Sequence, residues 1–203
     1  LTNYKKAYKL DPKKPFLLGS LQITQNQMCL WDDFFKIKKS VEDKILNQEK
    51  TSTPYVITTV YDSPELQLKS AKIWKNEYKI KDNNDFSFKE KNSKKIKLGF
   101  FSADFRTHAM GHLMVGMLEA HDKSEFDLYG FYFGPKIKPN DNLHNRISKC
   151  FVKLFDVTLM TDAEVIKLTK ELGINIAIDF MCHTGEYNRF SLFLNRLARV
   201  QIN

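Results

Sequence analysis

Long hydrophobic runs, paired cysteines and abundant arginine are what this sequence most clearly lacks. No stretch reaches the roughly 18–20 apolar residues that a membrane-spanning helix needs, and the polar start Leu1-Thr-Asn-Tyr-Lys-Lys does not read as a signal peptide. The three cysteines, Cys29, Cys150 and Cys182, are far apart and form no C-x-x-C motif. They predict no disulfide framework, so we expect a reducing, cytoplasmic compartment and no membrane partner.

Arginine is scarce although the chain is basic. The formal net charge is +8, but lysine outnumbers arginine 27 to 5 and is spread along the chain among Asp and Glu. A protein surface that binds nucleic acid concentrates its basic residues on one face or along one helix. A scattered excess of lysine is typical of a solvated surface, so we expect no nucleic-acid partner.

The two ends of the chain differ from those of a complete protein. It begins at Leu1 rather than at Met, and it stops at Val200-Gln-Ile-Asn203, inside an expected strand. We therefore expect it to be a piece of a longer protein. At 203 residues it has room for one or two domains, and its 42% hydrophobic and 13% aromatic residues suffice for a substantial core.

Residues 1–80 are predicted to be helical. The first helix ends as Ala7-x-x-Leu10-x-Pro12, which is similar to the close of the second helix of a tetratricopeptide repeat. A further helix is expected over residues 17–28. One partial copy of a repeat pattern is weak support for a repeat array, because many amphipathic helices end at a proline.

The rest of the helical region contains one ambiguous stretch. Asp32 or Asp33 is a plausible N-cap for a helix that runs to about residue 48, and Pro64 stands in the first turn of another. Residues 55–61 are β-branched and aromatic and fit either a strand or a buried helix. Residues 81–95 are polar and charged without a sustained period, so they are predicted to be a linker.

From residue 96 onward the pattern changes to alternating strands and helices. Ile96-Lys-Leu-Gly-Phe-Phe101 is typical of a buried strand, and Thr161-Asp-Ala-Glu164 has the form of a capping box. The expected strands are 96–101, 126–133, 151–155, 174–180 and one from 198, and the expected helices are 111–121, 142–149, 161–172 and 187–196. This series predicts an α/β fold with a Rossmann-like, doubly wound parallel sheet over residues 96–203.

Two loops are expected to meet at one edge of this sheet. With the strand order 3-2-1-4-5, the first and fourth strands are neighbours, and the winding reverses between them. Ligands in doubly wound sheets bind at such a switch point, beyond the carboxyl ends of the strands. The loops that follow these two strands are Ser102–His112 and Asp179–Thr184. We therefore predict the functional site between them.

The first of these loops, Ser102–His112, is dense in ionisable side chains in a chain with only 5 His. Histidine titrates near neutrality, and a positioned base contributes roughly 10² to 10⁴ to a rate. Asp104 precedes His108 by four residues and would orient the imidazole or receive its proton. The structural alternative for Asp104 is an Asx turn or a helix cap. Arg106 and Arg189 fit either a phosphate contact or an ion pair.

A metal site and a dinucleotide site are weaker interpretations of the same residues. His108 and His112 are four apart, as metal ligands on one helix face are, and Cys182 and His183 would add further donors. No H-E-x-x-H motif accompanies them, however. His183 is alternatively a loop residue bonded to backbone. No G-x-G-x-x-G follows the first strand, so NAD is not expected.

Several motifs resemble one family of enzymes. Residues 98–113 resemble the opening of the catalytic region in protein O-GlcNAc transferases and the related SPINDLY proteins, whose pattern is close to G-Y-x-S-x-D-F-x-x-H-x-x-x-H-L. His121-Asp-Lys-Ser-Glu-Phe126 is similar to their H-D-R-S-x-F segment. Asp179-x-x-x-His-Thr-x-x-x-Asn-Arg189 is similar to D-L-x-G-H-T-x-x-N-R, and Cys29-Leu-Trp-Asp-Asp-Phe34 to C-D-W. The motifs occur in the family's order and span nearly the whole chain.

The resemblance implies the N-terminal lobe of a GT-B glycosyltransferase behind a tetratricopeptide array. Such an enzyme transfers a sugar, with inversion, to Ser or Thr hydroxyls of an acceptor protein or peptide. Carried over by position, His108 is the base or the contact to donor and acceptor, and Asp104 takes part in proton removal. The other residues implied to line the substrate cleft are Met110, Gly111, His112, His183 and Thr184.

The resemblance implies no metal or other cofactor. The donor is a nucleotide sugar, for which UDP-GlcNAc is expected and UDP-glucose and GDP-fucose stay open. In the family a second, C-terminal lobe supplies most nucleotide contacts, and it is not among these 203 residues, so we expect this chain alone to be inactive. The alternatives are a repeat-type protein-binding adaptor with a non-catalytic lobe and a metal-dependent hydrolase that uses His108, His112 and His183.

The chain departs from the family pattern at a few positions. Cys182 stands where the family has Gly before His-Thr, and Leu197 and Arg199 replace the prolines of its R-P-A-P segment. Ala109 stands where animal members carry Pro after the motif His. This last difference favours a bacterial-type member.

Overall fold

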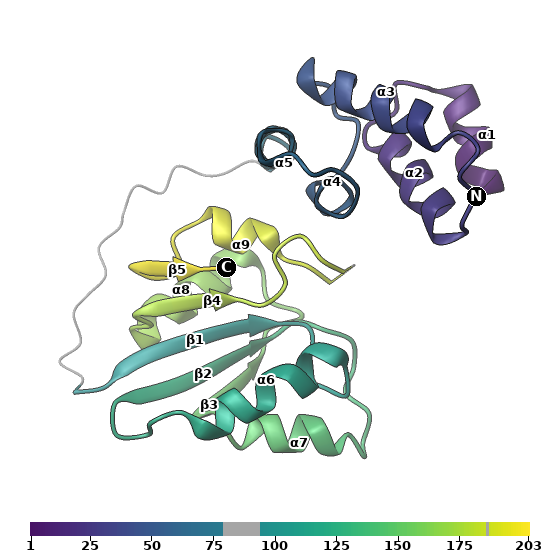
Figure 1. Cartoon of the computed structure of the whole chain (residues 1–203). Helices are drawn as coiled ribbons and strands as arrows, with labels where there is room; N and C mark the ends of the chain where they lie inside the picture. The colour runs from purple at the N-terminus through teal and green to yellow at the C-terminus, as the bar shows by residue number, and fades with distance from the viewer. Residues whose placement is uncertain (79–93, 186) are drawn as a thin grey trace. The chain divides into compact units, whose positions relative to one another are not determined.

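The computed structural model describes residues 1–78, 94–185 and 187–203. The chain divides into two compact units, Leu1–Lys79 and Ile80–Asn203 (Figure 1). Each unit has its own hydrophobic core. The predicted linker, residues 81–95, lies outside the described residues except for its last two positions.

Helices make up the described part of the first unit. They are α1 (Thr2–Leu10), α2 (Leu17–Gln27), α3 (Phe34–Leu46), α4 (Pro54–Val60) and α5 (Pro64–Lys75). Their core includes Tyr61, whose hydroxyl accepts a hydrogen bond from Gln22 Nε2 and donates one to Lys38 O, each at 3.0 Å. Burial raises the pKa of Tyr61 to about 12, so the phenol stays protonated and bonded.

The stretch that fits either a strand or a helix is helix α4. Pro54 takes the first helical position, where its fixed φ suits a helix, and Ile57 is fully buried in the core. Burial therefore outweighs the β propensity of this stretch. α5 starts at Pro64 as predicted, and Ser63 is its N-cap, whose hydroxyl accepts the Leu66 N–H at 3.2 Å. Asp33 is at the N-cap of α3, but its carboxylate makes no capping bond within the described residues.

Parallel strands form the sheet of the second unit. The described strands are β1 (Ile96–Ser102), β2 (Phe126–Tyr132), β3 (Lys153–Asp156), β4 (Ile176–Asp179) and β5 (Val200–Ile202). Their order is β3-β2-β1-β4-β5, and each neighbouring pair is parallel. The predicted α/β class is confirmed, and the strand order is the one assumed in locating the site.

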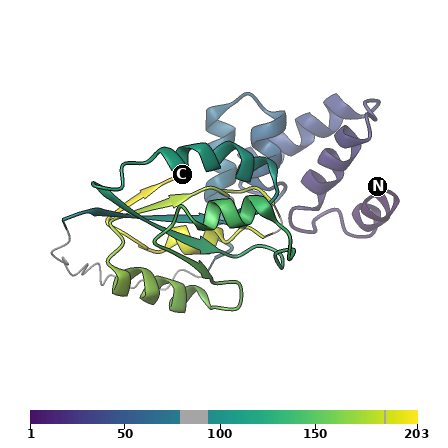
Figure 2. The same cartoon turned by 90° about the horizontal axis from the view of Figure 1, so that it is seen from below.

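Helices cover both faces of this sheet, as Figures 1 and 2 show. The helices are α6 (Ala109–Ala120), α7 (Asn142–Ser148), α8 (Asp162–Leu172) and α9 (Phe190–Leu194). Successive residues of a strand point to opposite faces. Phe100 of β1 therefore packs in one cluster with Leu118 of α6, and Phe101 packs in the other with Val165 of α8.

β4 and α9 are shorter than predicted. β4 begins at Ile176 rather than at 174, because the Ile174 N–H bonds back to Thr169 O (3.1 Å) and belongs to the turn that closes α8. α9 begins at Phe190 rather than at 187, because the Phe190 N–H donates to Asn188 Oδ1 (3.1 Å) in a local turn. The capping box of α8 is present as predicted.

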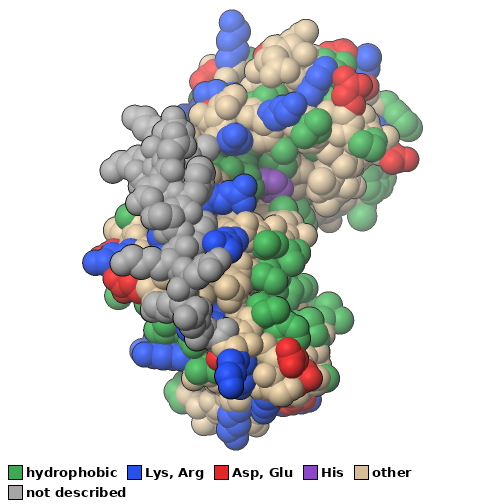
Figure 3. Space-filling model, turned by 90° about the vertical axis from the view of Figure 1, so that its left-hand side faces the viewer, with side chains coloured by type: hydrophobic (Ala, Val, Ile, Leu, Met, Phe, Trp, Pro, Cys, Tyr) green, Lys and Arg blue, Asp and Glu red, His purple; other side chains and the backbone are tan. Residues whose placement is uncertain are grey.

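The surface is mixed in charge. On the face drawn in Figure 3, Lys and Arg side chains are scattered, with Asp and Glu among them. The same face shows hydrophobic side chains between the charged ones, which is ordinary for folded proteins. Within the described residues, no helix is long and apolar enough to cross a membrane.

Candidate functional site

β1 and β4 lie side by side, so their carboxyl ends open at the same edge of the sheet. Phe101 of β1 pairs with Asp179 of β4, and the strand order reverses between these two strands. This edge is the switch point at which doubly wound sheets bind ligands. The loops that follow are in contact, since Ser102 Oγ lies 3.7 Å from Met181 Sδ. The structure therefore brings together the two loops that the sequence indicated.

The β1–α6 loop is held by short-range hydrogen bonds and by close packing at a glycine. The Asp104 N–H donates to Ser102 Oγ (3.0 Å), and the Arg106 N–H donates to Asp104 O (2.7 Å). Phe105 is fully buried and anchors the loop in the core. A Cβ on Gly111 would lie 2.3 Å from Arg106 O. Only glycine lets the first turn of α6 lie so close to the loop.

Asp104 and His108 form a close pair in this loop. Asp104 Oδ2 lies 3.3 Å from His108 Nδ1, and Oδ1 lies 3.1 Å from Arg106 Nη2. The Asp104 side chain is 9% exposed and that of His108 is 40% exposed. The carboxylate is thus withdrawn from solvent while the imidazole remains accessible. His108 is also the N-cap of α6, where Nδ1 accepts the Met110 N–H at 3.3 Å.

The two neighbours of His108 Nδ1 favour different tautomers. When Nδ1 accepts from the Met110 N–H, the proton of the neutral ring is on Nε2. When Nδ1 carries the proton, the N–H dipole lies close to the Asp104 carboxylate, whose Oδ2 is 3.3 Å from Nδ1, and Nε2 has a free lone pair. The second tautomer is the one that can take a proton from a bound hydroxyl group. Asp104 therefore favours the tautomer of His108 that has an accessible acceptor nitrogen.

Asp141, the N-cap of α7, holds this loop, although no motif in the sequence pointed to it. Its Oδ2 accepts the Thr107 N–H, and its Oδ1 accepts the Thr107 hydroxyl and the His144 N–H, each at 2.8 Å. Burial disfavours the charged form of Asp141, but these hydrogen bonds outweigh it and lower the pKa of the carboxyl group. The pattern around Asp141 signals a helix N-cap, but its partner Thr107 is 34 residues away, so no local pattern reveals the contact.

Asp179 ends β4, and His183 lies in the loop that follows it. Asp179 accepts the Met181 N–H (2.8 Å) and Asn203 Nδ2 (3.1 Å), yet burial raises its pKa. The His183 ring packs on Phe190 with centroids 4.5 Å apart. Its Nδ1 is buried without a hydrogen-bond partner among the described residues. Burial also lowers the pKa of His183, against the opposing effect of Asp179, so the ring is held neutral at neutral pH.

Cys182 and Thr184 shape the same loop. Cys182 has φ 46°, in the left-handed region that glycine adopts without strain and other residues adopt rarely. The resembled family carries Gly at this position, and the backbone here explains that preference. The Thr184 hydroxyl and N–H both donate to Met181 O, at 2.6 and 2.8 Å. This hydroxyl is therefore used within the loop turn.

The remaining candidate residues of the first loop differ in how far they are buried. Met110 is partly buried and packs against the core between the sheet and α6. His112 is exposed on α6. Gly111 has a steric role, because its missing side chain lets the helix approach the loop. Contacts of these three residues with a substrate stay a prediction.

Arg189 is a structural residue rather than a free phosphate ligand. Its guanidinium forms an ion pair with Asp162 and also donates to Val157 O (2.9 Å) and Met160 O (3.0 Å). The side chain is 17% exposed. Of the two alternatives for this arginine, the ion pair is the one observed. It ties the loop after β4 to the start of α8.

A metal centre is not formed by the histidines of the site. The described residues contain no group of three or more His, Cys, Asp or Glu side chains placed to hold a metal ion. His108, His112 and His183 are all described. The geometry of the described residues therefore gives no support to a hydrolase that uses these three histidines as metal ligands.

The fold and site define a Rossmann-like α/β lobe with an Asp–His pair at its switch point. The family model described as Glycosyl transferase family 41 matches residues 63–203. The chain belongs to this family of glycosyltransferases, as the resemblance of its motifs led us to expect. No curated protein matches the chain.

A solved structure supports the fold. The chain is similar to a mutant of the O-GlcNAc transferase from Thermobaculum terrenum, with a TM-score of 0.64 and 20% sequence identity. The alignment covers 98% of this chain and 39% of that one. At this identity the likeness shows the shared fold. The chain spans about two fifths of that protein's length.

Proposed function

We propose that the chain is part of an inverting glycosyltransferase that moves a sugar from a nucleotide-sugar donor to Ser or Thr hydroxyls of proteins. GlcNAc, carried by UDP, is the expected sugar. Membership of glycosyl transferase family 41 supports the transfer of a sugar, and the fold shared with an O-GlcNAc transferase motivates this choice. The observation that carries the role of this lobe is the His108–Asp104 pair at the switch point, 3.3 Å apart.

In the proposed reaction, the acceptor hydroxyl oxygen attacks the anomeric carbon of the sugar. The bond between that carbon and the diphosphate oxygen breaks, and the configuration inverts. The hydroxyl proton passes to Nε2 of His108, because the nearby Asp104 carboxylate favours the tautomer whose proton is on Nδ1. The buried Asp104 carboxylate then stabilises the imidazolium that forms.

The leaving diphosphate needs positive charge or hydrogen-bond donors from elsewhere. The arginines of the two loops are already engaged, since Arg106 pairs with Asp104 and Arg189 with Asp162. We therefore place the diphosphate ligands, and the residues that read the base and the sugar, in a second lobe of the whole protein. The 203 residues alone are then inactive. No metal is required by this scheme.

Two substitutions of His108 test its role as the base. In the whole protein, His108→Ala and His108→Asn are both expected to lower turnover by roughly 10² or more, because neither side chain accepts the proton. Asn is a good N-cap residue, so His108→Asn keeps α6 capped and separates catalysis from stability. Turnover would be compared with that of Lys149→Ala, a change at an exposed residue of the same unit. Wild-type turnover in a folded His108→Asn protein would refute the base role.

A further inference from the structure

A groove in the helical unit lies over α2, which packs against both α1 and α3. Its volume is about 520 Å³, within the range of roughly 300–1,000 Å³ that ligand-binding clefts occupy. Leu18 and Leu21 of α2, Tyr8 of α1 and Ile37 of α3 supply its apolar lining. The groove is therefore large enough for a bulky apolar side chain and the backbone on either side of it.

One polar atom of this groove lacks a partner. Gln25 of α2 lines the groove and is only 6% exposed. Its Oε1 is buried and has no hydrogen-bond partner among the described residues. Leaving a buried acceptor unpaired costs roughly 1–3 kcal/mol. This oxygen has almost no accessible surface, so a donor in the groove reaches it only after the Gln25 side chain turns toward the groove.

The rim of the groove is basic. Lys5, Lys9 and Lys36 line it, with Asp33 as the one acidic residue of its described lining. No ion pair joins these three lysines to another described residue. Unpaired lysines around an apolar cleft favour an occupant that carries carboxylates.

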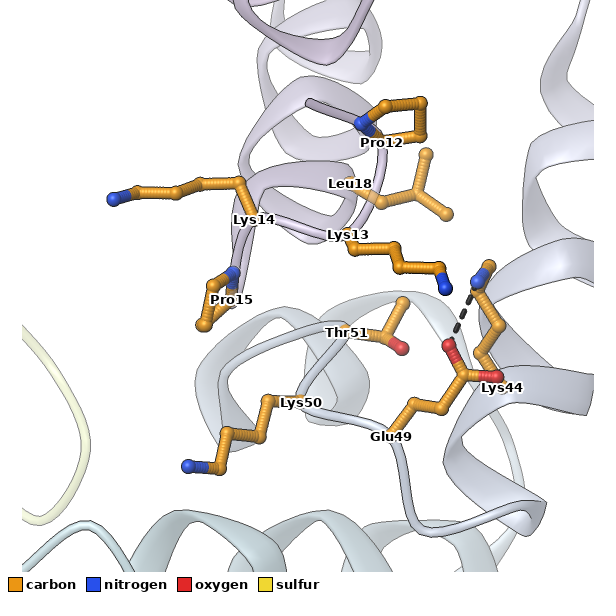
Figure 4. A pocket seen from close by; sticks show the side chains of 9 residues that line it. All are labelled: Pro12, Lys13, Lys14, Pro15, Leu18, Lys44, Glu49, Lys50 and Thr51. Carbon is orange, nitrogen blue, oxygen red and sulfur yellow. Dashed lines mark hydrogen bonds and ion pairs between the residues drawn. The ribbon is translucent and has the colours of Figure 1, made fainter. Parts of the chain in front are cut away.

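A second pocket, the lysine pocket, adjoins the groove, because Pro12 and Leu18 line both. Its volume is about 480 Å³. Figure 4 shows Lys13 pointing toward the ion pair of Lys44 and Glu49 (2.7 Å), while Lys14 extends to the other side. The groove is lined by three lysines and the lysine pocket by four, against one carboxylate in each. Lys44 pairs with Glu49 and Lys50 pairs with Glu77, so the excess of positive charge in the lysine pocket is that of Lys13 and Lys14.

We infer that the groove and the lysine pocket bind a short, extended, acidic segment of a partner protein. One large apolar side chain of the segment enters the groove, and a backbone N–H donates to Gln25 Oε1 once that side chain has turned toward the groove. Its carboxylates face the lysines of the rim and of the lysine pocket. An extended segment fits better than a helix, because the N–H groups of a helix are used inside it. The inference concerns the helical unit alone and does not depend on sugar transfer.

Panning of random heptapeptides on phage against the 203-residue chain tests this inference. We expect enrichment of peptides that combine two or more Asp or Glu with one Leu, Ile, Phe or Met. An enriched peptide, labelled with fluorescein, should bind in fluorescence anisotropy with an affinity that falls as salt rises, because exposed charges are screened. Enrichment of no common pattern, or of peptides without acidic residues, would overturn the inference.

Variants of the chain locate the bound peptide. Gln25→Leu is expected to weaken binding roughly fivefold to tenfold by removing the acceptor, while raising the melting temperature because a buried unpaired group is lost. Lys9→Glu, at an exposed site, should weaken binding at least as much, whereas Lys72→Glu on α5, away from the lining, should leave it unchanged. Equal affinity of wild type, Gln25→Leu and Lys9→Glu would exclude the groove. A dimer in sedimentation that Lys9→Glu dissociates would overturn the inference and assign the groove to a second copy of the chain.

Discussion

At the residue scale, Asp141 supports the site without belonging to the loop that carries His108. Asp141→Ala leaves the N–H groups of Thr107 and His144 without their acceptor. We expect the free energy of unfolding to fall by roughly 1–3 kcal/mol, measured by urea denaturation of the chain. Asp43→Ala, which removes one exposed ion pair with Lys39, should cost well under about 1 kcal/mol. Equal effects of the two changes would contradict the role given to Asp141.

The same carboxylate predicts a pH dependence. Despite its burial, hydrogen bonds lower the pKa of Asp141 in the folded chain. Asp141 therefore contributes its full stabilisation above the pKa of an Asp in the unfolded chain, about 3.9. This stabilisation is lost as the pH falls through the lower pKa that Asp141 has in the folded chain. We predict that the stability difference between wild type and Asp141→Asn shrinks from about pH 5 down to about pH 2. A difference that stays constant over this range would count against the prediction.

A substitution of Cys182 is expected to raise the stability of the chain rather than lower it. Its φ of 46° is costly for a residue with a Cβ, by roughly 1–2 kcal/mol, and a glycine avoids this strain at some cost in chain entropy. Cys182→Gly should therefore stabilise the chain by roughly 0.5–1 kcal/mol, seen as a higher melting temperature. Cys182→Ala keeps the strain and should give no gain. If Ala stabilised as much as Gly, backbone strain would not be the cause.

At the scale of the element, two glycines of α6 should respond in opposite ways to alanine. A Cβ on Gly111 would meet Arg106 O at 2.3 Å, whereas one on Gly116 would meet nothing within 4 Å. Gly116→Ala should stabilise the chain by roughly 0.5–1 kcal/mol through helix propensity. Gly111→Ala should destabilise it and, in the whole protein, lower turnover by displacing the loop that bears His108. Thermal unfolding of both variants checks this, and equal shifts would contradict the packing account.

Element types were predictable from the sequence wherever local signals agreed with burial. The capping box at Thr161 and the proline at 64 fixed helix starts, because capping and φ preference act within one turn. Residues 55–61 could not be decided, since their β-branched side chains suit a strand and only tertiary burial makes them helical. The starts of β4 and α9 were misplaced, because turn hydrogen bonds of Ile174 and Asn188 compete with the regular elements.

At the scale of the whole molecule, the alternation of strands and helices predicted where the site lies. With the assumed strand order, it predicted that the loop bearing Asp104 and His108 meets the loop after β4, and the contact of Ser102 with Met181 agrees with this. Contacts between distant segments could not be predicted in this way. Asp141 is an example. Its local role as a helix cap is visible in the sequence, but its bond to Thr107, 34 residues away, is not.

The central claim is that the lobe supplies the base for sugar transfer to a protein hydroxyl. To test this directly, the whole protein would be incubated with a Ser/Thr-rich peptide and one of the donors UDP-GlcNAc, UDP-glucose and GDP-fucose. Release of the nucleotide and the mass of the peptide would be measured. We predict that UDP-GlcNAc releases UDP and adds one sugar to the peptide, and that His108→Asn abolishes both. If a folded protein that binds the peptide released no nucleotide from any donor, the claim would be contradicted and a non-catalytic adaptor favoured.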